Sequence, residues 1–371
     1  MLDFRALGVS FEVKGTEVML VHLMDGITGF GINDLVLRIV AAMVTAFAGV
    51  WLSGGKVIAM LHKHQQKGQP IREDGPQSHL LTKKGTPTMG GVMILGAAVL
   101  SILLFADWQS VSVWVGCGVL LIYGAIGFAD DYLKVTRQSS RAMTAKMKLV
   151  LQFATALAAI AAVSWETPDN YRFVLNVPYF NWQWNIGWFY VLFAMVVIAG
   201  ASNGVNLSDG LDGLAAGLLS VAFTVFVIFA YAAALAISTT QIPAIPFAAE
   251  VAVMCAAVAG ACLGFLRFNR KPARVFMGDT GSLALGAFLG VAAVMLKQEI
   301  ILAIAGFVFV GESLSVIIQV YYFKLTKGKR FFKMAPIHHH FEQSGWSEMK
   351  VVCRFWAAGV VCALIGLAAL L

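Results

Sequence analysis

Charged residues are scarce in this sequence, whereas hydrophobic residues are abundant. Charged residues form 13% of the 371 residues and hydrophobic residues form 59%, while a typical soluble domain carries about 25% charged residues. A water-soluble fold has too little interior to bury so much apolar surface. The composition therefore excludes a soluble globular enzyme and indicates a protein embedded in a membrane.

The sequence also lacks the common signatures of cysteine metal sites and of nucleotide loops. The five cysteines lie inside apolar stretches, without a C-x-x-C spacing or a nearby histidine, so we interpret them as packing residues. No G-K-[ST] follows a glycine-rich segment, which excludes a P-loop. The chemistry of the chain has to come from other residues.

The apolar residues form runs of the length that a helix needs to cross a bilayer, which is about 20 residues. We predict an all-α polytopic membrane protein with ten membrane-spanning helices and a single domain. The predicted spans are 34–52, 88–106, 111–129, 148–165, 188–201, 214–236, 247–265, 282–296, 300–320 and 353–371. The domain is expected to cover residues 19–371. Residues 1–18 are interpreted as a dispensable extension, because Met19 could be the natural start.

The positions of lysine and arginine predict the orientation of these spans. Most of the 27 basic residues fall in the segments 53–87, 130–148, 266–281 and 321–350, and the intervening loops contain almost none. Because basic loops stay in the cytoplasm, these four segments are predicted to be cytoplasmic and both termini periplasmic. The formal net charge of +7 then follows from topology and requires no nucleic-acid partner.

Two adjacent carboxylates occur at a predicted cytoplasmic helix end. Asp130 and Asp131 lie in GFADDYLK, where the third span is expected to finish. A single aspartate at a helix end is commonly a cap, but two adjacent carboxylates raise each other's pKa unless a cation lies between them. We therefore interpret this pair as functional.

A second acidic segment, SNGVNLSDGLDGLA, lies between the fifth and sixth spans. Its candidate ligands are Asn203, Asn206, Asp209 and Asp212. Asp209 and Asp212 would share one helix face if the sixth helix started there, and the glycines would allow close backbone approach to a ligand. In the structural alternative, the glycines only serve helix packing and Asp209 caps the sixth helix.

A third segment, FNRKPARVFMGDTGS, places Asn269, Phe276 and Asp279 directly before a predicted helix. A helix N-terminus favours phosphate, and Asp279 could hold the metal ion that neutralises the phosphate charge. Oxygen ligands without cysteine or paired histidine spacing favour magnesium. These segments therefore indicate phosphoryl transfer, which depends on alignment and charge neutralisation.

The last polar segment, APIHHHFE, contains His338, His339 and His340. Adjacent residues point in different directions, so a zinc ion held by all three is disfavoured. We expect these histidines to donate hydrogen bonds or charge near phosphates.

Five motifs together resemble those of the polyprenyl-phosphate N-acetylhexosamine-1-phosphate transferases, in the same order. They are KKGTPTMGG at 83–91, GFADDYLK at 127–134, NLSDGLDGLA at 206–215, FNRKPARVFMGDTGS at 268–282 and APIHHHFE at 335–342. The resemblance runs from about residue 19 to the end. Ser208 stands where the family pattern has threonine, so the hydroxyl is retained. The first and last motifs favour the members that use UDP-N-acetylmuramoyl-pentapeptide.

The resemblance implies ten transmembrane helices, a homodimer, a short periplasmic β-hairpin at 173–185 and a site open to the cytoplasm in the bacterial inner membrane. The implied reaction transfers phospho-N-acetylmuramoyl-pentapeptide from its UDP-linked form to undecaprenyl phosphate, giving lipid I and UMP, with magnesium. We predict that the catalytic residues are Asp130, Asp131, Asp279 and His338, with Asp279 as the metal ligand. The predicted substrate-binding residues are Lys83, Lys134, Asn203, Asn206, Asp209, Asp212, Asn269, Phe276, His339 and His340.

We favour direct attack by an undecaprenyl phosphate oxygen on the β-phosphate of the nucleotide sugar, with Asp130 deprotonating or orienting the lipid phosphate. The alternative is an aspartate nucleophile and a phospho-enzyme, which the sequence does not distinguish. Two other functions stay open from the sequence: a sister transferase that uses UDP-N-acetylglucosamine, and a membrane transporter, for which intramembrane polar residues are also typical.

Overall fold

The computed structural model describes residues 34–65, 85–137, 143–180, 182–235 and 245–371. Among these residues, nine helices are long and apolar enough to cross a membrane, and a shorter apolar helix accompanies them. The ten are α2 (Asp34–His64), α4 (Gly91–Phe105), α5 (Val111–Arg137), α6 (Ala145–Glu166), α7 (Phe189–Ser208), α8 (Leu214–Ala234), α9 (Ala248–Asn269), α10 (Gly278–Leu296), α12 (Phe307–Leu325) and α14 (Glu348–Leu367). The chain is a multi-pass membrane protein. The predicted extension 1–18 and Lys83 lie outside the described residues.

Each predicted span corresponds to one of these helices, but several boundaries were wrong. α5 continues to Arg137 and α7 to Ser208, so the polar residues predicted at helix ends lie within the last turns of helices. The ninth predicted span is interrupted at Gly306, which ends the short helix α11 (Glu299–Ala305) and precedes α12. The periplasmic location of both termini stays a prediction.

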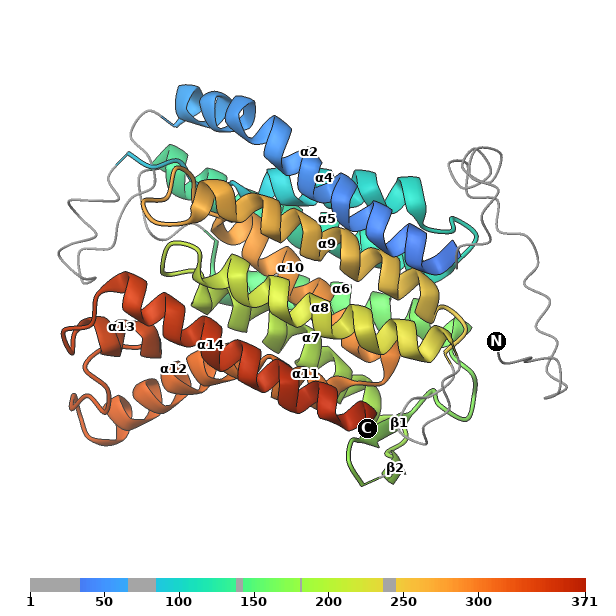
Figure 1. The fold of residues 1–371 in the computed structure, drawn as a ribbon. Coiled ribbons are helices and arrows are strands. Elements are labelled where there is room, and N and C mark those ends of the chain that lie inside the picture. The colour runs from blue at the N-terminus through green and yellow to red at the C-terminus, as the bar shows by residue number, and fades with distance from the viewer. Residues whose placement is uncertain (1–33, 66–84, 138–142, 181, 236–244) are drawn as a thin grey trace, which may run out of the picture.

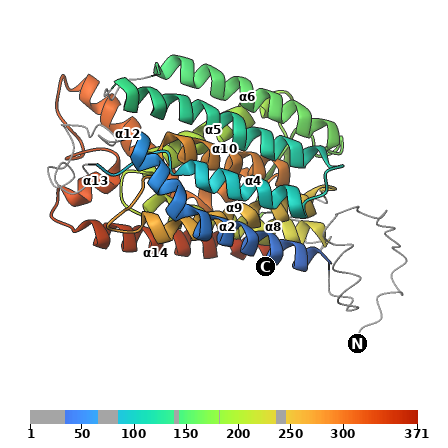
Figure 2. The same cartoon turned by 90° about the horizontal axis from the view of Figure 1, so that it is seen from above.

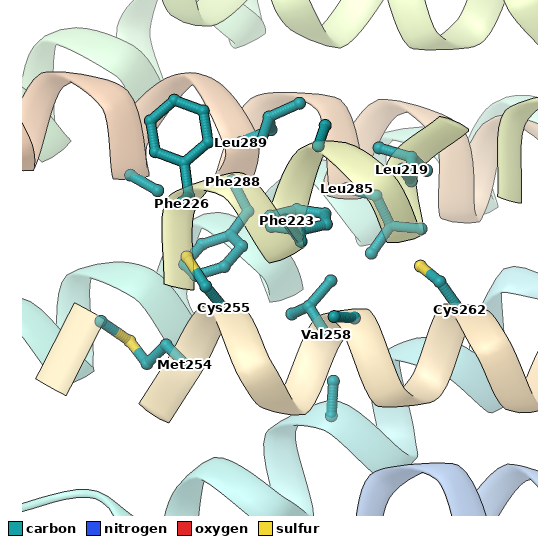
Figure 3. Packing of buried hydrophobic residues seen from close by; sticks show 14 of the residues in the cluster. Leu219, Phe223, Phe226, Met254, Cys255, Val258, Cys262, Leu285, Phe288 and Leu289 are labelled. Carbon is teal, nitrogen blue, oxygen red and sulfur yellow. The ribbon is translucent and has the colours of Figure 1, made fainter. Parts of the chain in front are cut away.

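α10 forms the centre of the bundle. In both views it lies among the other helices (Figures 1 and 2), and nearly all of its residues are buried. Its side chains pack with those of α8 and α9, where Phe288 stacks on Phe223 at 5.7 Å between ring centroids (Figure 3). α9 and α2 approach closely because of a glycine: a Cβ at Gly260 of α9 would lie 2.1 Å from the Met43 carbonyl oxygen of α2. The core thus fixes the position of the start of α10.

The predicted hairpin is present and lies at the same end of the bundle as the C-terminus (Figure 1). Strand β1 (Val174–Val177) pairs antiparallel with β2 (Trp182–Asn185). Lys297, which follows α10, donates from Nζ to the Arg172 carbonyl oxygen at 3.1 Å, just before the hairpin. Burial lowers the pKa of Lys297 and raises the pKa of neighbouring Glu299. The candidate site residues lie at the opposite end of the bundle.

The packing interpretation of the cysteines is confirmed for Cys117, Cys255 and Cys262, which are buried. It is wrong for Cys353, which is exposed on α14. An apolar run alone does not say which face of its helix points into the bundle, and α14 is an outer helix (Figure 1).

Candidate active site

Three carboxylates meet where α5 passes the start of α10. Asp130 and Asp131 lie on α5, and Asp279 is the second residue of α10. The helices approach closely because of Gly127, where a Cβ would lie 2.1 Å from the Asp279 carbonyl oxygen. Asp130 and Asp131 are almost fully buried. The structure therefore brings together the three aspartates that the sequence predicted as catalytic.

Asp131 caps the start of α10. Its Oδ1 accepts from the Asp279 backbone N–H at 3.2 Å, and its Oδ2 accepts from the Thr280 backbone N–H at 3.0 Å and from the Thr280 hydroxyl at 2.8 Å. The first N–H groups of a helix have no partner within it, and a negative charge there is favourable. Gly278 has φ +73°, and a Cβ there would lie 2.5 Å from Asp131 Oδ2. Asp131 thus fixes the backbone that carries Asp279.

Two lysines bridge the other two carboxylates. Lys134 Nζ lies 2.7 Å from Asp130 Oδ2 and 3.1 Å from Asp279 Oδ2. Lys148 Nζ, from the first turn of α6, lies 2.9 Å and 2.7 Å from the same two oxygens. Two ammonium groups therefore supply the positive charge that the adjacent carboxylates require. The predicted residue Lys134 is at the site, and Lys148 is a site residue that the sequence reading missed.

The two asparagines of α7 have different surroundings. Asn206 donates from Nδ2 to Asp279 Oδ1 at 2.9 Å and to the Ser282 hydroxyl at 2.8 Å. Asn203 donates instead to Gln152 Oε1 of α6 at 2.8 Å. Only Asn206 is hydrogen-bonded directly to the carboxylate group.

The segment after α7 does not start the next helix, which begins at Leu214. The idea that Asp209 caps the sixth helix is therefore wrong, since Gly213 is at that position with φ +81°. Asp209 instead accepts at Oδ2 from the Gly278 backbone N–H at 3.2 Å, which ties the segment 209–213 to the start of α10. The segment is a bridge between α7, α8 and α10.

Asp212 and Asn269 hold neighbouring loops together. Asp212 Oδ2 accepts from the Ala273 N–H at 3.0 Å, and Asn269 Oδ1 accepts from the Gly213 N–H at 3.1 Å. Both side chains are buried, 6% and 2% exposed. Glu348 at the start of α14 joins the same network, accepting from the Asp212 N–H at 3.0 Å. These predicted substrate-binding residues lie beside the site and support its loops.

Phe276 lies on the loop between α9 and α10, three residues before Asp279. Its backbone is held on both sides, because its N–H donates to the Pro87 carbonyl at 2.9 Å and its own carbonyl accepts from the Gly90 N–H at 2.8 Å. The residue is half-buried. A half-exposed ring on a fixed backbone is suitable for stacking on a flat ligand.

The three histidines of the short helix α13 (Ile337–Glu342) have different hydrogen-bond and ion-pair partners, although the rings of His338 and His339 lie 4.1 Å apart between centroids. His338 is fully buried, and its Nδ1 lies 3.1 Å from Glu312 Oε2 of α12. His339 pairs through Nδ1 with Glu342 at 2.7 Å, and His340 Nδ1 accepts from the Lys333 N–H at 3.2 Å. Over the described part of the chain, no group of three or more His, Cys, Asp or Glu side chains could hold a metal ion.

Comparisons with known proteins agree with the sequence motifs. The profile of glycosyl transferase family 4 matches residues 111–297, and the phospho-N-acetylmuramoyl-pentapeptide-transferase signature 1 matches residues 83–95. The phospho-N-acetylmuramoyl-pentapeptide-transferase of Rickettsia felis is 47% identical over 360 residues, covering 95% of this chain and 98% of that protein. That of Rickettsia montanensis is 48% identical over 336 residues, covering 89% and 91%. The chain belongs to the phospho-N-acetylmuramoyl-pentapeptide transferase family.

The matches to the transferase family include the site described above. The family 4 profile covers α5 to α10, and with them the three carboxylates and both bridging lysines. The histidine helix α13 and Glu312 lie after the end of that profile. They lie within the 95% of the chain that aligns with the Rickettsia felis transferase. One signal for Lys148 was present in the sequence: it is a lysine at the start of an apolar span on the predicted cytoplasmic side.

Proposed function

We propose that this chain transfers phospho-N-acetylmuramoyl-pentapeptide from its UDP-linked form to undecaprenyl phosphate, giving lipid I and UMP. The observation that carries the proposal is the group of Asp130, Asp279, Lys134 and Lys148 at one end of the bundle. Transfer of a phosphate-linked sugar requires positioned charges more than a reactive side chain. The relatives named for this transferase, nearly half identical over most of the chain, support the choice of substrates.

The proposed location is the bacterial inner membrane, with the site facing the cytoplasm. The supporting observation is that the site lies at the end of the bundle where α5 and α12 finish in basic segments, with Lys134 and Arg137 in the last turn of α5 and Lys324 in the last turn of α12. Such segments stay on the cytoplasmic side, where a UDP-linked sugar would be available. A homodimer, implied by the family resemblance, is part of the same proposal.

The donor atoms are suitable for magnesium as the cofactor. Mg²⁺ is usually held by one or two carboxylates together with substrate phosphates. Asp279 Oδ2 and Asp130 Oδ2 face the same two ammonium groups, so both oxygens point into one shared space. Asp279 is our proposed metal ligand, with Asp130 beside it, and the bound ion would neutralise charge on the diphosphate.

Direct transfer is the mechanism that the contacts favour. Asp131 has its oxygens occupied by three donors from the start of α10, which makes it a poor nucleophile and a positioning residue for Asp279. Asp130 contacts the two lysine ammonium groups, so it could orient or deprotonate the lipid phosphate once the lysines bind phosphate oxygens. Lys134 and Lys148 would then hold the negative charge on the diphosphate and on departing UMP.

The test uses the purified full-length chain in detergent with undecaprenyl phosphate, magnesium and one nucleotide sugar at a time. We expect UMP release with UDP-N-acetylmuramoyl-pentapeptide and loss of release when EDTA removes divalent ions. UMP release only with UDP-N-acetylglucosamine would assign the chain to the sister activity instead. Release of UMP without the lipid acceptor, together with phosphate label on the protein, would support the phospho-enzyme mechanism.

A further inference from the structure

A buried acid–histidine pair lies beside the site, outside the carboxylate group. Glu312 of α12 and His338 of α13 both have fully buried side chains, with 3.1 Å between Glu312 Oε2 and His338 Nδ1. Burying a carboxylate costs free energy unless a partner compensates it. Within the described residues neither side chain has a hydrogen-bond partner, so the compensation for Glu312 is the electrostatic contact with His338. This contact links α13 to a membrane-spanning helix.

The opposite edge of the His338 ring faces the segment 209–213. A Cβ at Gly210 would lie 2.4 Å from His338 Nε2 and 2.9 Å from its Cε1. A carboxylate beside Nδ1 favours the tautomer with the proton on Nδ1, which leaves Nε2 without a hydrogen where the ring meets the Gly210 backbone. The ring thus fills the space between α12 and this segment, and glycine is the residue that fits there.

The segment that His338 contacts is joined directly to the start of α10. Asp209, the neighbour of Gly210, accepts from the Gly278 N–H at 3.2 Å, and Gly278 precedes Asp279. Contacts therefore run from Glu312 through His338 and Gly210 to the backbone beside the proposed metal ligand. His339 and His340 have other partners: His339 Nδ1 pairs with Glu342 of the same helix, and His340 Nδ1 accepts from the Lys333 N–H.

We propose that Glu312 is a positioning residue for the transfer reaction: its carboxylate fixes the buried His338 ring, which holds the segment 209–213 in place beside the nucleotide-sugar site. The inference rests on the proposed function. It gives His338 a supporting role in place of the catalytic role predicted from the sequence, since a fully buried ring wedged against Gly210 has no face toward substrate.

The first test is the kinetics of Glu312→Gln, with Ser315→Ala as the matched control. Ser315 is also buried on α12, but its hydroxyl only donates to the Glu312 carbonyl of its own helix. We expect Glu312→Gln to raise KM for the nucleotide sugar by about fivefold, because the neutral amide removes the negative charge 3.1 Å from His338 Nδ1. KM for undecaprenyl phosphate should not change, and Ser315→Ala should behave as wild type. A merely structural defect would lower kcat through a smaller folded fraction and leave both KM values unchanged.

The second test asks whether Glu312 acts through His338. In a His338→Ala background, Glu312→Gln should add no further increase in KM, because residues that act through one another are not additive. Gly210→Ala should raise KM for the nucleotide sugar in the wild-type background, since its methyl group pushes on the ring, and should have little effect once His338 is alanine. Additive effects in the first pair, or an equal penalty from Gly210→Ala in both backgrounds, would overturn the proposal.

Two controls keep the outcomes separable. Thermal unfolding in detergent reports whether each variant is folded, and if Glu312→Gln does not fold, the comparison of Gly210→Ala with and without His338→Ala decides the question. Wild-type turnover tests the proposed function itself. Normal turnover with an unchanged KM in Glu312→Gln rejects this inference alone, whereas no UMP release by wild type rejects the proposed function.

Discussion

Asp131→Asn should reduce the stability of the protein as well as its activity. The carboxylate accepts three hydrogen bonds at the start of α10. An amide keeps one oxygen, so at least one backbone N–H of Asp279 or Thr280 would face an NH₂ group. A buried donor left without an acceptor costs about 1–3 kcal/mol, and loss of the negative charge at a helix N-terminus costs about 0.3–2 kcal/mol. Relief from burying a charge offsets part of this, which leaves a net loss of roughly 1–3 kcal/mol.

The comparison that isolates this effect is Asp130→Asn. Asp130 is as buried as its neighbour. Its Oδ2 contacts Lys134 and Lys148, and both lysines would still be paired with Asp279 after Asp130 became neutral. We expect Asp130→Asn to lose UMP release while its unfolding temperature stays near that of wild type, and Asp131→Asn to lose both. Thermal unfolding in detergent and the UMP assay on the same samples measure the two effects. Equal unfolding temperatures for the two variants would refute the assignment of Asp131 as the cap of α10.

Three further outcomes are expected. Asp279→Asn should abolish transfer and weaken the magnesium requirement, because an amide is a poorer ligand for a hard cation. UMP release across a magnesium titration measures this effect. Activity near that of wild type would instead indicate Asp130 as the metal ligand. Phe276→Ala should raise KM for the nucleotide sugar by roughly tenfold to a hundredfold, since stacking on a base is worth about 1–3 kcal/mol, while Phe276→Trp should retain affinity. A lower kcat at constant KM would indicate a packing role. A reporter fused after Lys329 should report a cytoplasmic location and one at Asn176 a periplasmic location. The reverse result would place the site on the periplasmic side, away from the UDP-linked sugar.

The helices were predictable because the bilayer imposes one length and one composition on each span. Because every span has a similar composition, the sequence does not show at which residue a helix ends. Polar residues such as Asn206 were interpreted as loop residues, although α7 runs to Ser208, because a polar residue at the end of a span is compatible with either state. The break at Gly306 was missed for a related reason: glycine is common in membrane helices, so its presence does not reveal an interruption.

The composition of the site was predictable from its motifs, but the division of roles was not. Asp130 and Asp131 are neighbours in the sequence, and both were predicted to be catalytic. On a helix, adjacent residues point about 100° apart, so one side chain faces the start of α10 and the other faces the lysines. Which one does which depends on the rotation of α5 against α10, and that is set by the close contact at Gly127. No local pattern in GFADDYLK reports that rotation.

Lys148 changes the electrostatic account of the site. The sequence predicted two substrate-binding lysines, Lys83 and Lys134, and of these Lys134 lies beside the carboxylates in the described residues. Lys134 alone would leave a strongly negative group in a region of low dielectric. With Lys148, the three carboxylates and two ammonium groups carry one net negative charge. Such a group repels a bare diphosphate and accepts one that arrives with a divalent cation, because the pair then brings positive charge to the carboxylates and phosphate oxygens to the lysines. The two lysines therefore keep the net charge of the group small. One bound divalent cation is then enough to make this net charge positive, and a positive site is what a charged diphosphate requires.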